Sequence, residues 1–347
     1  MILQYAELAV NLEKIRRFLS VGSEERQTAD QRRFAYIGCI SALYASFENF
    51  AERVALRFGE MLLADAPRLP AEQMANLRRR YIRNASLLLN QNLGSGRYRE
   101  ITELDVAKSL ASCLDESSPS FDLKLELIAL HNSNLRWDSL CELFQWAVPD
   151  LQSKIYRSDA IANWNDCTGN PTQGGLASAL KSELEDLVER RNEVSHRAIP
   201  EEIQSYERLI AKVDFIEAVA LGLVASLAET ILNRSIDDGE TVSLGVPSEY
   251  FRGNRIVVIN SLGSPVSEGD CVLLGGGHSM RWGRIQEIRL EDSRVSRATA
   301  GVEAGLCLDF EARRGSDLLL WRNPNPDLAF PPDRIFGRHG PLGDIIQ

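Results

Sequence analysis

The sequence has few of the residues that build metal clusters, disulfide frameworks or broad nucleic-acid surfaces. Its four histidines and six cysteines are scattered along 347 residues, and no Cys-x-x-Cys pair occurs. We therefore expect reduced, mostly buried cysteines, and we predict neither a metal site nor a cofactor. The formal net charge of −10 argues against a protein that coats nucleic acid through a wide basic face. Any contact with nucleic acid must be local.

The sequence also lacks segments that direct a chain into or through a membrane. Glu7 and Glu13 interrupt the first apolar stretch, so the chain does not open with a signal peptide. The longest apolar stretch, 215–232, contains Glu217 and Glu229, which is too much charge for a membrane span. A P-loop motif, Gly-x4-Gly-Lys-Ser/Thr, is missing as well. These features predict a cytoplasmic protein without membrane contact and without a GTPase domain.

The first two thirds of the chain have the period of amphipathic helices. Apolar residues recur three and four positions apart from Phe34 to Phe58, behind Thr28 and Asp30 as capping residues. Further stripes predict helices over 71–89, about 177–196, and about 200–234. Together they predict an all-α helical bundle over residues 1–236.

After residue 236 the pattern changes to short β-like runs separated by Gly, Pro and Asp. The runs are 257–259, 271–274, 284–288, 306–308 and 318–320. They predict a small all-β barrel over residues 237–347. The fold class is therefore multidomain, α plus β.

The most informative string of the sequence is Arg191-Asn192-Glu193-Val194-Ser195-His196, near the end of an expected helix. Composition alone gives a chance Arg-x4-His roughly 0.4 times per chain, and the added Asn lowers this to roughly 0.02. Arginine binds phosphate, and histidine accepts and donates protons near neutral pH. These two side chains together suffice for the cleavage of RNA. We predict that His196 transfers protons, that Arg191 holds the scissile phosphate, and that Asn192 orients the phosphate or the imidazole.

A second interpretation of the string remains open. Basic residues stabilise the last turn of a helix, and Pro200 indicates that this helix ends just beyond the string. On that interpretation the string is a helix-end feature and has no catalytic role.

Five further residues are weaker candidates for substrate binding: Arg190, Arg197, Glu48, Arg79 and Arg80. Glu48 is a carboxylate on an otherwise apolar helix, in a position to face His196; the alternative is a solvated or internally paired residue. The arginines of 78–83 offer cations for phosphates, or else form a solvated helix face paired with the surplus acids. His131 has no acidic or thiol neighbour at ligand spacing, so we expect it to be structural or exposed.

Three stretches of the helical half resemble the RiboL-PSP branch of the HEPN superfamily of ribonucleases. They are the Arg-Asn-x3-His motif at 191–196, the run 187–192 that leads into it, and the run 134–140. The resemblance covers about residues 30–235. It departs at Arg197, where a small residue is common in the family. The resemblance implies metal-independent RNA cleavage that leaves 2′,3′-cyclic phosphate ends, in a homodimer whose two motif helices form one cleft. It also implies antiviral defence, or a toxin restrained by a regulatory or antitoxin partner.

The second half resembles the β-barrel that follows the GTPase domain of translation elongation factors. The matching runs are 263–272, 284–288 and 298–306. This resemblance implies tRNA or another translation component as partner. Two alternatives to an RNase remain open. One is a non-catalytic HEPN module for dimerisation or nucleotide binding, with a barrel that binds a translation component. The other is a stand-alone translation accessory protein.

Overall fold

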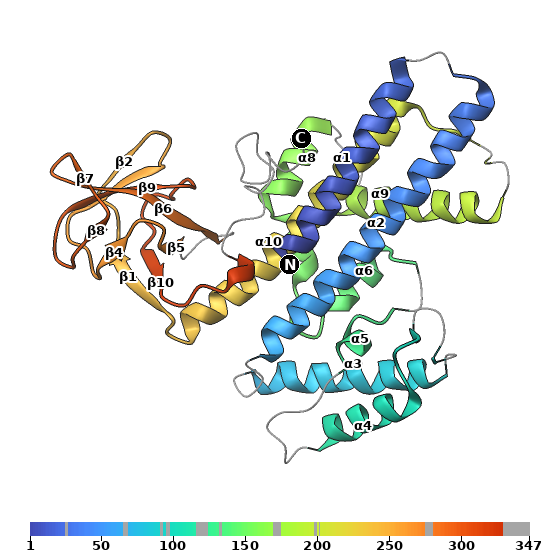
Figure 1. The fold of residues 1–347 in the computed structure, drawn as a ribbon, viewed down its shortest axis with the longest axis horizontal. Helices are drawn as coiled ribbons and strands as arrows, with labels where there is room; N and C mark the ends of the chain where they lie inside the picture. The colour runs from blue at the N-terminus through green and yellow to red at the C-terminus, as the bar shows by residue number, and fades with distance from the viewer. Residues whose placement is uncertain are drawn as a thin grey trace. The chain divides into compact units, whose positions relative to one another are not determined.

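The computed structural model describes residues 1–24, 27–64, 69–90, 93–94, 98–115, 124–131, 134–168, 175–197, 200, 202–274 and 280–328. Within these residues, ten helices precede a group of antiparallel strands (Figure 1). The chain divides into two compact units, Leu3–Leu223 and Val224–Gln347. The division falls inside the last helix, and the sequence pattern changes from helical to β-like at that helix's end.

The described helices are α1 (Ile2–Glu24), α2 (Ala29–Leu63), α3 (Ala71–Leu89), α4 (Glu103–Leu114), α5 (Leu125–Ile128), α6 (Trp137–Phe144), α7 (Leu151–Tyr156), α8 (Asp159–Thr168), α9 (Gly175–His196) and α10 (Tyr206–Asp237). Five of the described helices are long, with 19 to 35 residues: α1, α2, α3, α9 and α10. The helix predicted around 71–89 is confirmed as α3, and α9 and α10 begin near 175 and 206, where starts near 177 and 200 were predicted. The short helices α5 to α8 were not predicted individually.

Helix α2 is the central element of the first unit. Thr28 caps it as expected, in a capping box with Gln31 in which each side chain binds the other residue's backbone N–H. Its buried stripe, which includes Leu43, Phe47 and Val54, packs against α5, α6 and α9. Helices α3 and α4 lie side by side at one end of α2 (Figure 1).

Helix α10 satisfies the length and hydropathy test for a membrane span. The mean hydropathy of its most apolar 18-residue window is 1.9, and 72% of that window is buried inside the structure. Core helices of globular proteins pass the same test, so the finding is weak evidence for a membrane segment.

The second unit consists of antiparallel strands. They are β1 (Thr241–Gly245), β2 (Glu249–Phe251), β3 (Ile256–Ile259), β4 (Val266–Ser267), β5 (Cys271–Leu274), β6 (Arg281–Leu290), β7 (Ser293–Val295), β8 (Arg297–Ala298), β9 (Ala304–Leu308) and β10 (Leu318–Trp321). The main sheet has the order β1-β10-β5-β6-β9-β3-β2, with β7 also on β6, and β4 pairs with β8. All five predicted runs are strands. A closed barrel is not established by this topology.

Strand β6 links the two halves of the main sheet. Its first residues pair with β5, and its later residues pair with β9 after an irregularity between Ile285 and Glu287. At Gly283 a Cβ atom would lie 2.0 Å from an Asp309 carboxylate oxygen, so only glycine allows this approach. That carboxylate accepts a 2.8 Å hydrogen bond from the Arg284 backbone N–H. The strands enclose their own apolar core, centred on residues such as Val272, Leu306 and Leu318.

The six cysteines are free thiols in this structure. Cys39, Cys113 and Cys271 are buried, as expected of small apolar residues. Cys141 and Cys307 are half-buried, and Cys167 is exposed.

Candidate functional site

Arg191 lies on α9 with its guanidinium turned toward α2 and the segment before α6. Its Nη1 donates to Oδ1 of Asn134 at 3.3 Å and to Oδ1 of Asn192 at 3.2 Å. The two asparagines also bind each other, because Nδ2 of Asn134 donates to Oδ1 of Asn192 at 2.8 Å. Asn192 therefore orients the arginine in this chain. The sequence predicted a role for Asn192 toward the phosphate or the imidazole instead.

Tyr44 of α2 forms the platform beneath this arginine. The guanidinium carbon of Arg191 lies 5.0 Å from the centre of the Tyr44 ring, which is a cation–π contact. The Tyr44 hydroxyl accepts from the Leu135 backbone N–H at 2.8 Å and donates to Glu48 at 3.0 Å. Burial raises the pKa of Tyr44 to about 12, and the Glu48 carboxylate adds to this effect while the Leu135 N–H opposes it. The hydroxyl thus remains protonated and joins α2 to the segment that carries Asn134.

Helix α3 holds the backbone before and after the segment that carries Asn134. Arg80 is buried and donates to three main-chain carbonyls, those of Ile128, Glu142 and Leu130 at 2.8, 2.8 and 3.4 Å. Burial lowers the pKa of Arg80 to about 10. The guanidinium satisfies carbonyls inside the fold, so we assign Arg80 to structure. The sequence predicted Arg80 as a candidate for substrate binding, and its buried position does not support that role.

Arg191 differs from the arginines around it in having no carboxylate partner. Among the described residues, no Asp or Glu oxygen lies within the 4.0 Å limit of an ion pair with its guanidinium. Arg190 and Arg197, its neighbours in sequence, are paired with Asp186 and Glu193. A half-buried guanidinium held by two amides and a ring is therefore available to an external anion.

His196 is the last residue of α9, and its side chain is exposed. In the described part of the chain it makes no hydrogen bond or ion pair. Five residues on a helix rotate by about 140°, so the two side chains point to different sides of α9. Asn192 lies four residues before His196 and shares its face. One chain therefore does not bring the predicted proton donor and phosphate ligand together.

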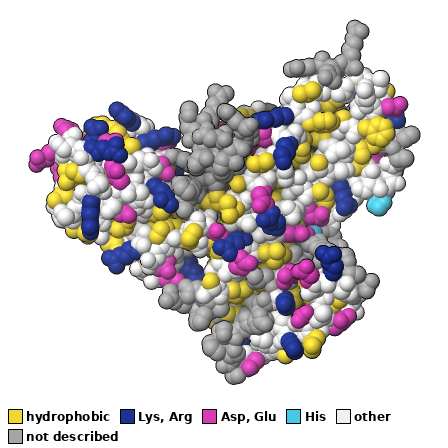
Figure 2. Space-filling view, viewed as in Figure 1, with side chains coloured by type: hydrophobic (Ala, Val, Ile, Leu, Met, Phe, Trp, Pro, Cys, Tyr) yellow, Lys and Arg dark blue, Asp and Glu magenta, His cyan; other side chains and the backbone are white. Residues whose placement is uncertain are grey.

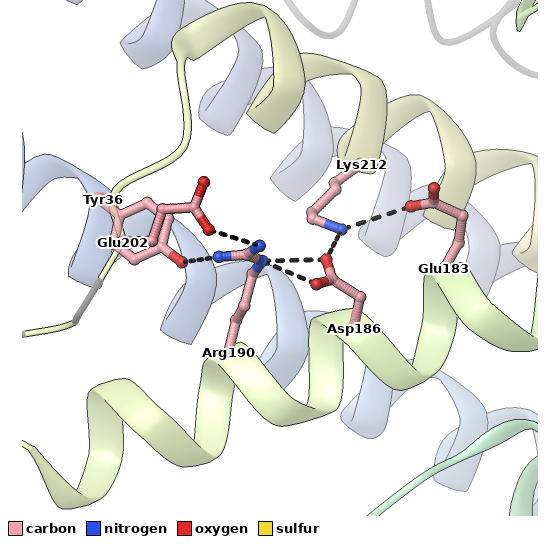
Figure 3. A network of polar contacts seen from close by, with 6 residues as sticks. All are labelled: Tyr36, Glu183, Asp186, Arg190, Glu202 and Lys212. Carbon is pink, nitrogen blue, oxygen red and sulfur yellow. Dashed lines mark hydrogen bonds and ion pairs between the residues drawn. The ribbon is translucent and has the colours of Figure 1, made fainter.

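Arg190 belongs to a separate polar network, shown in Figure 3. It donates to both oxygens of Asp186 at 3.0 Å and to the Tyr36 hydroxyl at 3.1 Å, and Glu202 lies 4.0 Å away. Lys212 of α10, with only 6% of its side chain exposed, pairs with Asp186 and with Glu183 at 3.4 Å. These contacts hold α9 against α2 and α10. Arg190 therefore acts as an anchor of the motif helix in this structure.

The network changes the pKa values of its members. Burial works to raise the pKa of Asp186, but hydrogen bonds and charges from Lys212 and Arg190 outweigh it and place this pKa below its usual value. For Arg190, burial works to lower the pKa, while Tyr36 and Asp186 outweigh it and raise it. Burial raises the pKa of Tyr36. The charged forms of Asp186, Arg190 and Lys212 thus stabilise one another.

The remaining sequence candidates lie in different places. Arg197 is exposed and reaches Glu193 at 4.0 Å. Arg79 is exposed on α3 and donates to Asn76. Glu48 was expected to face His196, but it instead accepts from Tyr44 and lies in a group with Glu52 and His131. On the face shown in Figure 2, acidic and basic side chains of the described residues are intermixed and do not form one continuous basic area.

Sequence reasoning missed the surroundings of His131. Its Nε2 lies 2.6 Å from Oε1 of Glu52, although the two residues are 79 positions apart. Glu48, Glu52 and His131 each offer a ligand atom, and these atoms lie within 4.8 Å of one another. The sequence signal was the spacing of Glu48 and Glu52, which places both carboxylates on one face of a helix. The structure is needed to show that His131 lies beside these two carboxylates.

Comparison with known families agrees with the helical unit. The family model RiboL-PSP-HEPN matches residues 6–233, which is more than half of the chain. A search of curated proteins and a search of solved structures gave no match. The helical bundle, with the motif on α9, is thus a HEPN domain. The chain belongs to the RiboL-PSP-HEPN family.

Proposed function

We propose that the HEPN domain is the catalytic part of an endoribonuclease. The observation that carries this proposal is Arg191, whose guanidinium is fixed by Tyr44, Asn134 and Asn192 and is not paired with any described carboxylate. An arginine in this condition suits a phosphate, because its planar donors match two phosphate oxygens.

RNA supplies its own nucleophile, the 2′-hydroxyl next to each phosphate. Cleavage then requires removal of that proton, stabilisation of charge on the phosphate, and protonation of the leaving 5′-oxygen. We assign proton transfer to His196 and phosphate binding to Arg191. The 2′-oxygen forms a bond to phosphorus as the bond to the 5′-oxygen breaks, which leaves a 2′,3′-cyclic phosphate and a 5′-hydroxyl. This chemistry requires no metal ion in the reaction itself.

The site is completed by a second chain in this proposal. His196 and Arg191 point to different sides of α9, so the exposed imidazole of one protomer must approach the guanidinium of its partner. A two-fold axis between the two α9 helices achieves this, since it brings each residue near its symmetry-related copy. The proposal therefore includes a homodimer formed through the HEPN domain.

Cleavage of RNA by the purified full-length protein tests this function. The wild-type protein is incubated with total RNA in magnesium-free buffer, and the new RNA ends are mapped by sequencing. We expect 2′,3′-cyclic phosphate ends, with cleavage reduced by about 100-fold or more in Arg191→Ala and in His196→Ala. Arg17→Ala is the matched control, because Arg17 is an exposed arginine of α1 whose one ion pair among the described residues is with Glu13.

Two results would overturn the proposal. One is a wild-type protein that cuts none of the RNAs offered. The other is a His196→Ala protein that cuts like the wild type. A dimeric wild-type protein without cleavage would favour the alternative, a non-catalytic HEPN module for dimerisation or nucleotide binding.

For the second unit we propose a barrel like that of elongation factors, which binds tRNA or another component of translation. The structure supports this in one place. Loop residue Gly263 donates its N–H to the Leu244 carbonyl at 3.0 Å, next to edge strand β1, and a Cβ there would lie 2.3 Å from the Ser243 oxygen. The preceding residue, Leu262, exchanges backbone hydrogen bonds with 301–302. A loop thereby covers the edge of β1.

Crosslinking of the full-length protein to RNA in cells tests the role of this second unit. We expect tRNA crosslinks that map to residues 239–328. Crosslinks to the helical unit alone would contradict the proposed barrel function. Crosslinks in which ribosomal RNA replaces tRNA would point to a translation accessory role.

The biological role that fits this chemistry is antiviral defence, or a toxin restrained by a regulatory partner in the cytoplasm. Uncontrolled cutting of tRNA stops translation. Expression of the wild-type protein should therefore arrest growth, and expression of Arg191→Ala should not.

A further inference from the structure

The group of Glu48, Glu52 and His131 lies beside the motif without forming part of it. Glu48 and Glu52 are four residues apart on α2, and His131 follows α5. The ligand atoms of the three lie within 4.8 Å of one another. The His131 and Glu52 side chains are only 8% and 19% exposed. Two carboxylates and an imidazole thus converge in a largely enclosed place.

The fold brings His131 to this place through several specific contacts. Arg80 donates to the Ile128 and Leu130 carbonyls, and Asn84 of α3 donates to the carbonyl of Leu127. These bonds fix the backbone immediately before His131. The imidazole therefore meets α2 at a defined position.

The two carboxylates of the group favour a bound cation. Two carboxylates at this separation repel each other where water is partly excluded. Among the described residues, Glu48 has no Lys or Arg nitrogen within 4.0 Å, and it accepts a hydrogen bond from the Tyr44 hydroxyl. A metal ion bound by both carboxylates would offset this repulsion.

The donor set is one that divalent transition metals prefer. Zinc binds imidazole nitrogen and carboxylate oxygen at about 2.0–2.2 Å, often with three protein ligands and one open position. The Nε2 of His131 and Oε1 of Glu52 are 2.6 Å apart. As ligands of one zinc ion these two atoms would be roughly 3.4 Å apart, so the distance between them must increase by less than about 1 Å. Small side-chain rotations achieve that.

We propose that Glu48, Glu52 and His131 form a site for one zinc-type divalent ion. The ion would bind between His131 and Glu52 and would fasten the segment after α5 to α2. Asn134 lies three residues beyond His131 and holds Arg191 and Asn192. The site is therefore a structural clamp beside the motif, and it does not depend on whether the protein cuts RNA.

Zinc titration of the full-length protein, freed of metal by chelation, tests this site. Bound zinc is followed by competition with a chromophoric chelator. We expect one equivalent of zinc per wild-type chain and a rise in melting temperature on binding. Glu52→Gln and His131→Asn should each weaken binding by about 100-fold or more. Glu60→Gln is the matched control on the same helix, because Glu60 pairs with Arg57 on the surface.

Folding of each variant is checked by circular dichroism, so that a lost site is distinguished from a lost fold. No saturable zinc binding by the wild type up to about 100 μM would overturn the proposal. Zinc binding that is unchanged in both Glu52→Gln and His131→Asn would also overturn it, since the ion would then lie elsewhere. Neither result bears on RNA cleavage, which is measured separately.

Discussion

At the scale of single residues, the motif contains two adjacent arginines with opposite surroundings. Arg190 is surrounded by Asp186, Tyr36 and Glu202, whereas Arg191 contacts only neutral groups among the described residues. An arginine whose donors meet carboxylates inside the fold stabilises structure, and one that lacks them suits an external phosphate. The sequence predicted Arg191 as the phosphate ligand and Arg190 as a weaker substrate-binding candidate, and the structure adds that Arg190 is paired inside the fold.

The pKa of Asp186 leads to a prediction about pH. Its pKa in the folded protein lies below the value in the unfolded chain. The charged carboxylate therefore stabilises the fold above the unfolded pKa, and this stability is lost as pH falls through the folded pKa. We expect Asp186→Asn to be less stable than wild type near pH 7, with the difference shrinking below about pH 4. Urea unfolding at several pH values measures this. A difference that grows in acid would contradict the assignment.

Tyr44 has two functions that substitutions separate. Tyr44→Phe keeps the ring beneath Arg191 but removes the acceptor of the Leu135 N–H, and we expect a loss of about 1–3 kcal/mol in unfolding free energy. Tyr44→Leu also removes the cation–π contact with Arg191. RNA cleavage should therefore fall further in Tyr44→Leu than in Tyr44→Phe. Equal cleavage by the two variants would show that the ring does not position Arg191.

At the scale of elements, α2 is the helix on which the site depends. It carries Tyr44, Glu48 and Glu52, and its start is fixed by the capping box of Thr28 and Gln31. We expect Thr28→Ala to lower the unfolding free energy by about 1 kcal/mol. Ser86→Ala on α3 is the control, because within the described part of the chain the Ser86 hydroxyl bonds only to a carbonyl one turn earlier in its own helix. A chemical denaturation series compares the two. A loss no larger than that of the control would rule out a stabilising cap.

Local patterns predicted the elements better than the contacts between them. The stripes of α2 and α3 and the run of β5 lie in the sequence itself, because helix and strand periods are local. Strands β1 and β2 were missed, since neither forms a continuous apolar run: β1 has one buried residue and the three-residue β2 has none. The meeting of His131 with Glu52 was also missed, because it depends on how α3 holds a segment far from α2 in sequence.

At the scale of the whole molecule, the motif is divided between two sides of one helix. Arg191 faces α2 and Asn134, while His196 is exposed at the end of α9. The sequence predicted this separation from helix geometry, and the packing of α9 agrees with it. The proposed function therefore depends on a second protomer that supplies the missing group.

Mixing two inactive variants tests this central claim most directly. Arg191→Ala keeps His196, and His196→Ala keeps Arg191, so a mixed dimer contains one intact pair across its interface. The proteins are unfolded and refolded together, and RNA cleavage is compared with each variant refolded alone. We expect each variant alone to be inactive and the mixture to regain part of the wild-type activity, with 2′,3′-cyclic phosphate ends. A mixture as inactive as its components, beside an active wild type, would contradict a site shared between two chains.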